Sequence, residues 1–129
     1  MATTTDIYAA VELGSPGVSA GNANKLTLQE SSATVQIHTQ LTNGAGVPSA
    51  FNAPTLYYAV SPFDMTAEAA MVRLAHVART LKLLPSNQPG TSLDSVSDAV
   101  LVTGAYLYTW ISHPNLSPAL TLNAKAVEI

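Results

Sequence analysis

The chain contains no cysteine, and only 10% of its 129 residues are charged, against about 25% in a typical soluble domain. The missing cysteine excludes disulfides, thiolate metal sites and a cysteine nucleophile. No apolar run approaches the roughly 18 residues of a membrane-spanning helix, and the first residues lack the basic and apolar segments of a signal peptide. We therefore expect a chain that is made in the cytoplasm without a visible export signal.

The few charges also restrict the partners. Five Lys and Arg residues against eight Asp and Glu residues give a net charge of −3, with no basic patch for nucleic acid and no basic amphipathic segment for a membrane surface. Fourteen Thr and twelve Ser residues stand where charges would be usual. Charge usually keeps a free monomer soluble. The sequence therefore suggests that much of the surface is covered in the working state, although hydration by Ser, Thr and Asn is the simpler alternative.

Alternating apolar side chains predict several short strands in a single domain over residues 1–129, after an N-terminal arm of about residues 1–5. The clearest strand covers 33–41, where Val35, Ile37 and Leu41 share one face. Loops rich in small residues, Gly and Pro are predicted over 14–24, 45–54 and 85–91. The remaining predicted strands cover 6–13, 26–28, 55–60, 96–102, 105–111 and 120–129.

Residues 66–84 are ambiguous. One helix could run from 66 to about 82, or a short helix over 66–75 could be followed by a strand that ends before Pro85. We favour the short helix, because the sheet would otherwise lack a strand. Thr103-Gly104 has the spacing of a hairpin turn, and a terminal strand would leave an end free for pairing. These features predict a mostly β fold, an antiparallel, jelly-roll-like β-sandwich with one helix, or alternatively a helix on a single sheet.

No catalytic or metal-binding motif is present. His38, His76 and His113 lack local ligand spacing, and we interpret them as structural or surface residues. Asp94 and Asp98 lack the remaining ligands of a calcium loop and are better explained as a solvated loop edge. Nucleophile elbows, phosphate loops and dinucleotide fingerprints are also absent from the sequence. We therefore expect neither an enzyme nor a bound cofactor.

Aromatic residues on one predicted strand are the most specific feature. Tyr106, Tyr108 and Trp110 alternate with aliphatic residues, so they share one face of the strand. This row could form the core, contact a partner, or stack against a sugar. Tyr57 and Tyr58 lie on another strand, one on each face, so only one of them can join the row. The candidate interface residues are Tyr57, Tyr58, Tyr106, Tyr108, Trp110 and Ile129.

The Thr-rich segment 1–5, the absence of cysteine, the small-residue loops and the segments 102–111 and 120–129 together resemble small structural proteins of tailed bacteriophages. The resemblance is to capsid decoration, or cement, proteins in particular. It implies a virion protein, made in the host cytoplasm, that is β-rich and often trimeric. Such a subunit sits on the shell and clamps neighbouring major capsid proteins. A tail or fibre component and a carbohydrate-binding β-sandwich module are the alternatives.

Overall fold

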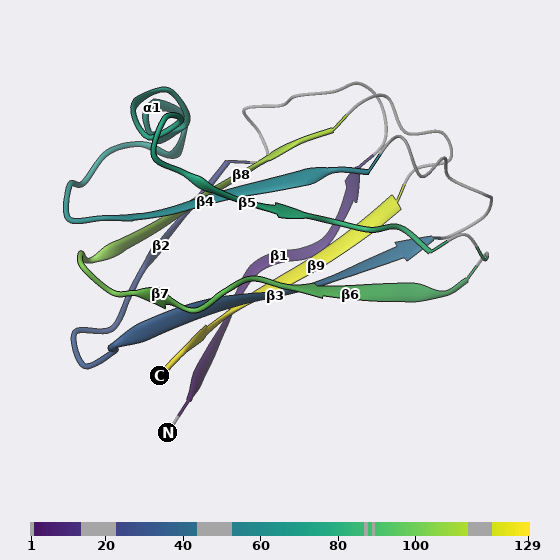
Figure 1. Ribbon diagram of the computed structural model, residues 1–129, viewed down its shortest axis with the longest axis horizontal. Coiled ribbons are helices and arrows are strands. Elements are labelled where there is room, and N and C mark those ends of the chain that lie inside the picture. The colour runs from purple at the N-terminus through teal and green to yellow at the C-terminus, as the bar shows by residue number, and fades with distance from the viewer. Residues whose placement is uncertain (1, 14–22, 44–52, 87, 89, 114–119) are drawn as a thin grey trace.

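The computed structural model describes all residues except 1, 14–22, 44–52, 87, 89 and 114–119, and it shows two antiparallel sheets packed face to face (Figure 1). The first sheet has the order β1 (Thr3–Leu13), β9 (Leu120–Glu128), β3 (Thr34–Asn43), β6 (Ser92–Val96), and the short β7 (Val100–Leu101) also pairs with β3. The second sheet has the order β2 (Asn24–Thr27), β8 (Tyr106–Ser112), β4 (Thr55–Ser61), β5 (Arg79–Lys82). The helix α1 (Ala67–Arg73) lies on the outer side of the second sheet.

The strand pairs are nested. Strand β1 pairs with β9, β2 with β8, β3 with β6, and β4 with β5, each time antiparallel. One long hairpin rolled into two sheets produces this pairing, and it is the arrangement of a jelly roll. The prediction of a mostly β, jelly-roll-like sandwich with one short helix is confirmed.

The core lies between the two sheets and follows the predicted alternation. On β3, Val35, Ile37 and Leu41 are buried while Gln36, His38 and Gln40 face outward. Full burial of one such aliphatic side chain contributes about 1.5–3 kcal/mol to folding. The other large side chains with at most 1% exposure in this core are Leu13, Leu56, Leu83, Leu107, Ile111, Leu120 and Leu122.

The predicted strand 96–102 is wrong as a single element. Ser97 interrupts it, because its hydroxyl accepts a hydrogen bond from the Ile37 N–H at 2.9 Å and its own N–H donates to the Ile37 carbonyl. The chain leaves the ladder there and rejoins it as β7. Thr103-Gly104 is not a hairpin turn either, since β7 and β8 belong to different sheets. A Cβ atom at Gly104 would lie 2.3 Å from the Pro62 nitrogen, so glycine permits this close crossing.

Strand β1 breaks the simple alternation that the sequence predicts. Ile7 and Tyr8 are both buried, while Ala9 is exposed, because the register with β9 shifts twice between Asp6 and Val11. Ala10 has a φ of 50°, which is unusual for a residue with a Cβ atom. Such an irregularity is a β-bulge, and it turns Tyr8 into the core.

The ambiguous segment 66–84 contains a short helix and a strand, as favoured from the sequence. Thr66 caps α1, because its hydroxyl accepts a hydrogen bond from the Ala69 N–H at 3.2 Å. The chain then turns and forms β5.

The two predicted ends differ from the structure. The segment 3–5, expected in an arm, pairs with the end of β9. The prediction that the strand 120–129 leaves an end free for pairing is wrong, because β9 lies between β1 and β3. The Ile129 N–H donates to the Thr34 carbonyl, and the Ile129 carbonyl accepts from the N–H groups of Ala33 and Thr34.

Candidate functional site

The aromatic row of β8 lies on the outer face of the second sheet, beneath α1. Tyr108 is fully buried and Trp110 is 6% exposed, and both pack with Ala70 of the helix. Leu107 and Ile111, on the opposite face, belong to the core between the sheets. The sequence left three interpretations of this row open: a core between the sheets, a contact with a partner, or stacking against a sugar. The structure places the row in a second, smaller core that the chain's own helix covers.

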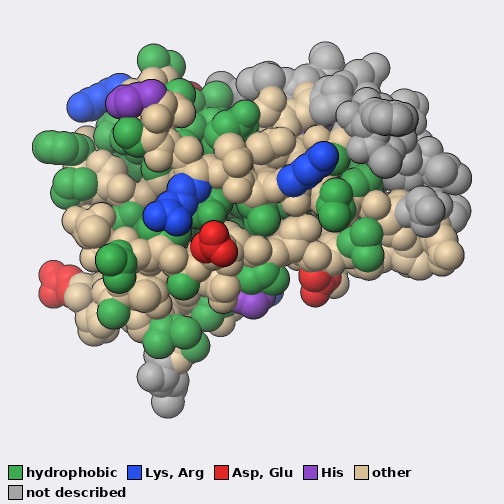
Figure 2. Space-filling model, in the orientation of Figure 1, with side chains coloured by type: hydrophobic (Ala, Val, Ile, Leu, Met, Phe, Trp, Pro, Cys, Tyr) green, Lys and Arg blue, Asp and Glu red, His purple; other side chains and the backbone are tan. Residues whose placement is uncertain are grey.

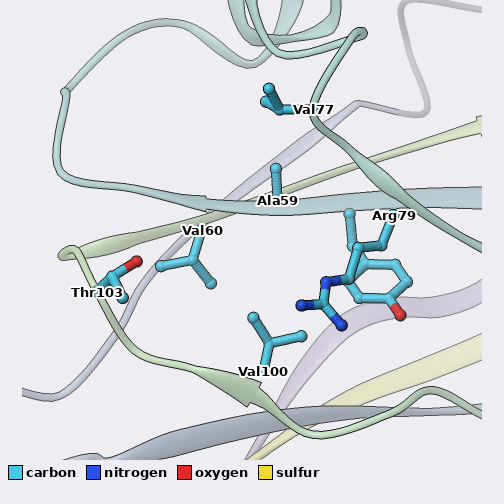
Figure 3. A pocket seen from close by; sticks show the side chains of 7 residues that line it. Ala59, Val60, Val77, Arg79, Val100 and Thr103 are labelled. Atoms are coloured by element: carbon cyan, nitrogen blue, oxygen red, sulfur yellow. The ribbon is translucent and has the colours of Figure 1, made fainter.

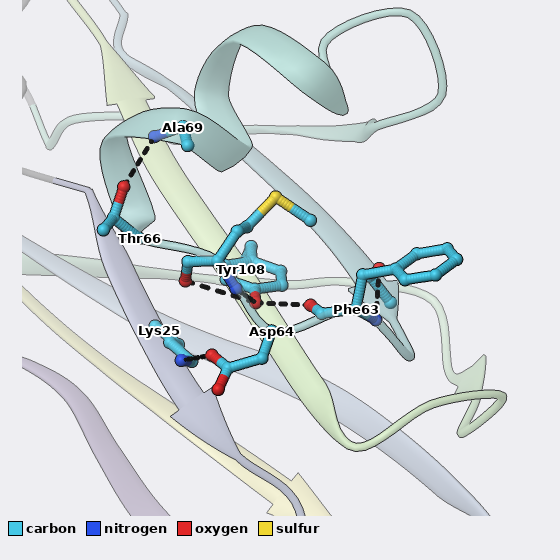
Figure 4. Close-up of polar contacts among 8 residues, drawn as sticks. Lys25, Phe63, Asp64, Thr66, Ala69 and Tyr108 are labelled. Atoms are coloured by element: carbon cyan, nitrogen blue, oxygen red, sulfur yellow. Dashed lines mark hydrogen bonds and ion pairs between the residues drawn. The ribbon is translucent and has the colours of Figure 1, made fainter.

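The hydroxyl of Tyr108 fixes the segment between β4 and α1. It donates to the Phe63 carbonyl at 2.7 Å and accepts a hydrogen bond from the Met65 N–H at 3.0 Å (Figure 4). Beside it, the Lys25 ammonium forms an ion pair with Asp64 and donates a hydrogen bond to its carboxylate. The hydrogen bond to Asp64 raises the pKa of Lys25. These contacts attach the helix to the sheet on which it rests.

Tyr57 joins the row, and Tyr58 does not. The Tyr57 and Trp110 rings stack with their centroids 5.7 Å apart and their planes 3° apart. Tyr58 lies in the core between the sheets with 4% exposure. Tyr57 and Tyr106 are half-buried and Ile129 is 63% exposed, so these are the predicted interface residues that a partner can reach in this conformation.

Exposed apolar side chains occur on both outer faces. The helix patch consists of Phe63, 64% exposed, and Val72, 79% exposed, on the side of the second sheet. The strand patch consists of Leu101, 68% exposed, and Ile129. Leu101 pairs with Thr34 on one side and Ile129 pairs with Thr34 on the other, so the two residues lie in one row across the first sheet. Figure 2 shows hydrophobic side chains around α1 and around β7, with Lys and Arg side chains over β5 between them.

A cleft opens along one edge of the sandwich, between β5 of the second sheet and β7 of the first (Figure 3). Its volume is ≈ 170 Å³. Apolar side chains form most of the wall, and among the described residues that line it Arg79 alone is charged. The lining residues are Tyr58, Ala59, Val60, Val77, Arg79, Val100 and Thr103.

The three histidines lie on separate parts of the fold. His38 is exposed on β3, His76 is exposed after α1, and His113 is buried after β8. Within the described part of the chain, no three His, Asp or Glu residues lie close enough together to hold a metal ion. Asp98 lies in the loop between β6 and β7, as expected for a loop edge, whereas Asp94 is an exposed residue within β6.

Among the described residues, no helix has the length and apolar character needed to cross a membrane. Neither a family model nor a curated protein matches the chain. Among solved structures, the chain is similar to one from Desmodium yellow mottle tymovirus, with 10% sequence identity, coverage of 99% of this chain and 85% of that chain, and a TM-score of 0.37. Values this low establish neither a shared family nor a shared function.

Proposed function

We propose that this protein is a structural subunit of a virus particle, and that it acts as a capsid decoration or cement protein rather than as an enzyme. The nested pairing of the eight main strands carries the proposal, because jelly rolls of this kind form viral capsid domains as well as lectins. The scarcity of charge supports it, since a subunit surrounded by neighbours needs less charge to stay soluble.

The two apolar patches suit contacts with neighbouring subunits. The helix patch and the strand patch lie on opposite faces of the sandwich, so one subunit can touch two neighbours at once through different surfaces. Full burial of a side chain such as Val72 or Leu101 contributes about 1.5–3 kcal/mol, and repeated copies around a shell add avidity. A protein that binds the assembled shell but not its separated parts stabilises the shell by mass action.

The proposed partners are the major capsid protein and further copies of this chain, with a trimer favoured. Tyr57, Tyr106 and Ile129 would contact these partners directly. Tyr58, Tyr108 and Trp110 are buried and would support the interface without touching a neighbour. Tyr108 and Trp110 pack against α1, and Tyr58 packs in the core between the sheets.

The test uses purified protein and emptied shells of the virus that encodes it. Val72→Glu and Leu101→Glu place a charge in each patch, and Gln40→Glu places the same charge on an exposed strand position outside both patches. We expect the wild-type protein and Gln40→Glu to co-sediment with shells and to raise their disassembly temperature. The two patch variants should bind at least tenfold more weakly. Equal binding by all four proteins, or none by the wild type, contradicts the proposal.

The two alternatives give different outcomes. A tail or fibre component would be found away from the capsid when the particle is labelled and viewed by electron microscopy. A carbohydrate-binding module needs an open aromatic platform, but Trp110 is buried and stacked on Tyr57. The burial therefore disfavours sugar stacking on this row.

A further inference from the structure

We infer that the cleft between β5 and β7 is a binding site for a carboxylate attached to a small apolar group. This goes beyond the proposed structural role and does not depend on it. Three observations support it: an arginine at a core-facing strand position, a tyrosine hydroxyl that reaches the cleft and has no hydrogen bond to a described residue, and apolar walls around both.

Arg79 lies where the alternation of β5 calls for an apolar side chain. It pairs with Tyr58 in the ladder, as Leu81 pairs with Leu56, and residues paired in this way point to the same side of the sheet. Arg79 is therefore on the core side, at the open edge between the sheets. The two ion pairs among the described residues are Lys25–Asp64 and Lys125–Asp6, which leaves the Arg79 guanidinium without a carboxylate.

Tyr58 provides the second polar group. Its side chain is 4% exposed, and its hydroxyl forms no hydrogen bond with the residues that the structure describes. No fully buried side-chain oxygen or nitrogen of the described residues lacks a partner, so the Tyr58 hydroxyl reaches accessible space. The cleft that Tyr58 lines is such a space. A nearly buried hydroxyl gains most from a ligand that accepts its proton, because few waters can reach it.

The remaining walls define the rest of the ligand. Val60, Val77 and Val100 line the cleft, and Figure 3 shows these side chains and Arg79 around the same opening. Its ≈ 170 Å³ corresponds to about five or six waters, the size of one branched aliphatic or aromatic group. A guanidinium binds a carboxylate through two parallel hydrogen bonds, and the tyrosine hydroxyl can donate a third. The chemistry thus selects an apolar carboxylate over a neutral apolar molecule or a bare anion.

Such a carboxylate can belong to a free acid or to the end of a polypeptide. The test titrates isovalerate and benzoate, as free acids, and an acetylated tripeptide ending in leucine, each against ¹⁵N-labelled protein followed by NMR. The neutral controls are isovaleramide, benzamide and the same peptide with an amidated end. We expect shifts at Val77, Val100 and Arg79 for the carboxylates. Free acids that bind while the peptide fails identify a small-molecule site, and a peptide that binds at least tenfold more tightly identifies a polypeptide end.

Variants assign the effect to the two groups. Arg79→Gln and Tyr58→Phe should each weaken carboxylate binding by about tenfold or more. Lys82 is the other positively charged residue of β5, and it pairs with Thr55 on the outer side of the sheet. Lys82→Gln should therefore leave binding unchanged. Thermal unfolding of each variant checks that the fold is intact. The inference is overturned if amides bind as tightly as acids, if Lys82→Gln weakens binding as much as Arg79→Gln, or if no carboxylate binds at 10 mM, a concentration of about 100 times a Kd of 0.1 mM.

Discussion

Replacing Tyr108 by Phe removes one oxygen atom from the contact between β8 and the segment that leads into α1. In the wild type this oxygen serves both the Phe63 carbonyl and the Met65 N–H. The ring would remain beneath Ala70, so the change tests the hydrogen bonds rather than the packing. A buried polar group without its partner costs about 1–3 kcal/mol, and the segment is exposed enough for water to replace part of the loss. We therefore expect a loss of about 2 kcal/mol in the free energy of unfolding.

The assay is urea unfolding followed by the fluorescence of Trp110, the single tryptophan, which lies in the same small core. A chain of this size is expected to unfold in two states. With an m-value of about 2 kcal/mol per molar urea, the midpoint should fall by about 1 M.

Tyr106→Phe is the matched control, because Tyr106 lies on the same face of the same strand and its hydroxyl has no hydrogen bond to any described residue. Its midpoint should move by less than about 0.25 M, the range of ordinary surface substitutions at this m-value. Equal shifts for the two variants, or no shift for Tyr108→Phe, would refute the conclusion that this hydroxyl holds the helix segment on the sheet.

Three further predictions follow from the fold. Gly104→Ala should lower the free energy of unfolding by about 1–3 kcal/mol, since the added Cβ atom forces the Ser61–Pro62 backbone away. An unchanged melting temperature would contradict this close approach of Gly104 to Ser61 and Pro62. Burial raises the pKa of Tyr8 to about 12, so the stability that neutral Tyr8 contributes is full below pH 10 and is lost as the pH rises toward 12. The loss should reach about 2–3 kcal/mol. Between about pH 9 and 11.5 the melting temperature should therefore fall less steeply for Tyr8→Phe than for the wild type, and equal slopes would contradict the raised pKa of Tyr8. Glu128→Ala should destabilise the protein by about 2 kcal/mol, because the buried Glu128 carboxylate accepts hydrogen bonds from the Gln29 N–H at 2.7 Å and the Ser32 hydroxyl at 3.0 Å. The control is Glu30→Ala, in the turn between Gln29 and Ser32, which should change the melting temperature little.

Regular alternation made the fold class predictable from the sequence. Strand β3 shows this best, because its core-facing residues recur at every second position without interruption. The period-2 pattern places one face inward whatever lies on the other side. The predicted sandwich with one short helix therefore did not require knowledge of long-range contacts.

The errors arose where a single side chain changes the ladder. Ser97 ends β6 by bonding to Ile37, which is 60 residues away in the sequence. The bulge in β1 depends on Asn123, whose side chain accepts a hydrogen bond from the Ala10 N–H at 2.9 Å. Neither contact leaves a local sequence signal, so the break at 97–99 and the inward turn of Tyr8 could not have been predicted.

The aromatic row illustrates the same limit for the candidate site. The sequence correctly places Tyr106, Tyr108 and Trp110 on one face and Leu107 and Ile111 on the other. Strand alternation cannot identify what covers a face, and here α1 covers it. The cleft was missed because its key residue, Arg79, is an ordinary charged residue in the sequence and becomes unusual only through its pairing with Tyr58.

The position of β9 has a consequence for how the protein is made. Strands β1 and β3 do not pair with each other, because β9 lies between them. While the ribosome is still synthesising residues before Leu120, the first sheet therefore lacks its central strand, and the edges of β1 and β3 that pair with β9 have no hydrogen-bond partner there. Unpaired strand edges of this kind promote aggregation, and pairing between such distant segments slows folding. The growing chain is thus expected to depend on β9, or on a chaperone until β9 has been synthesised, to complete this sheet.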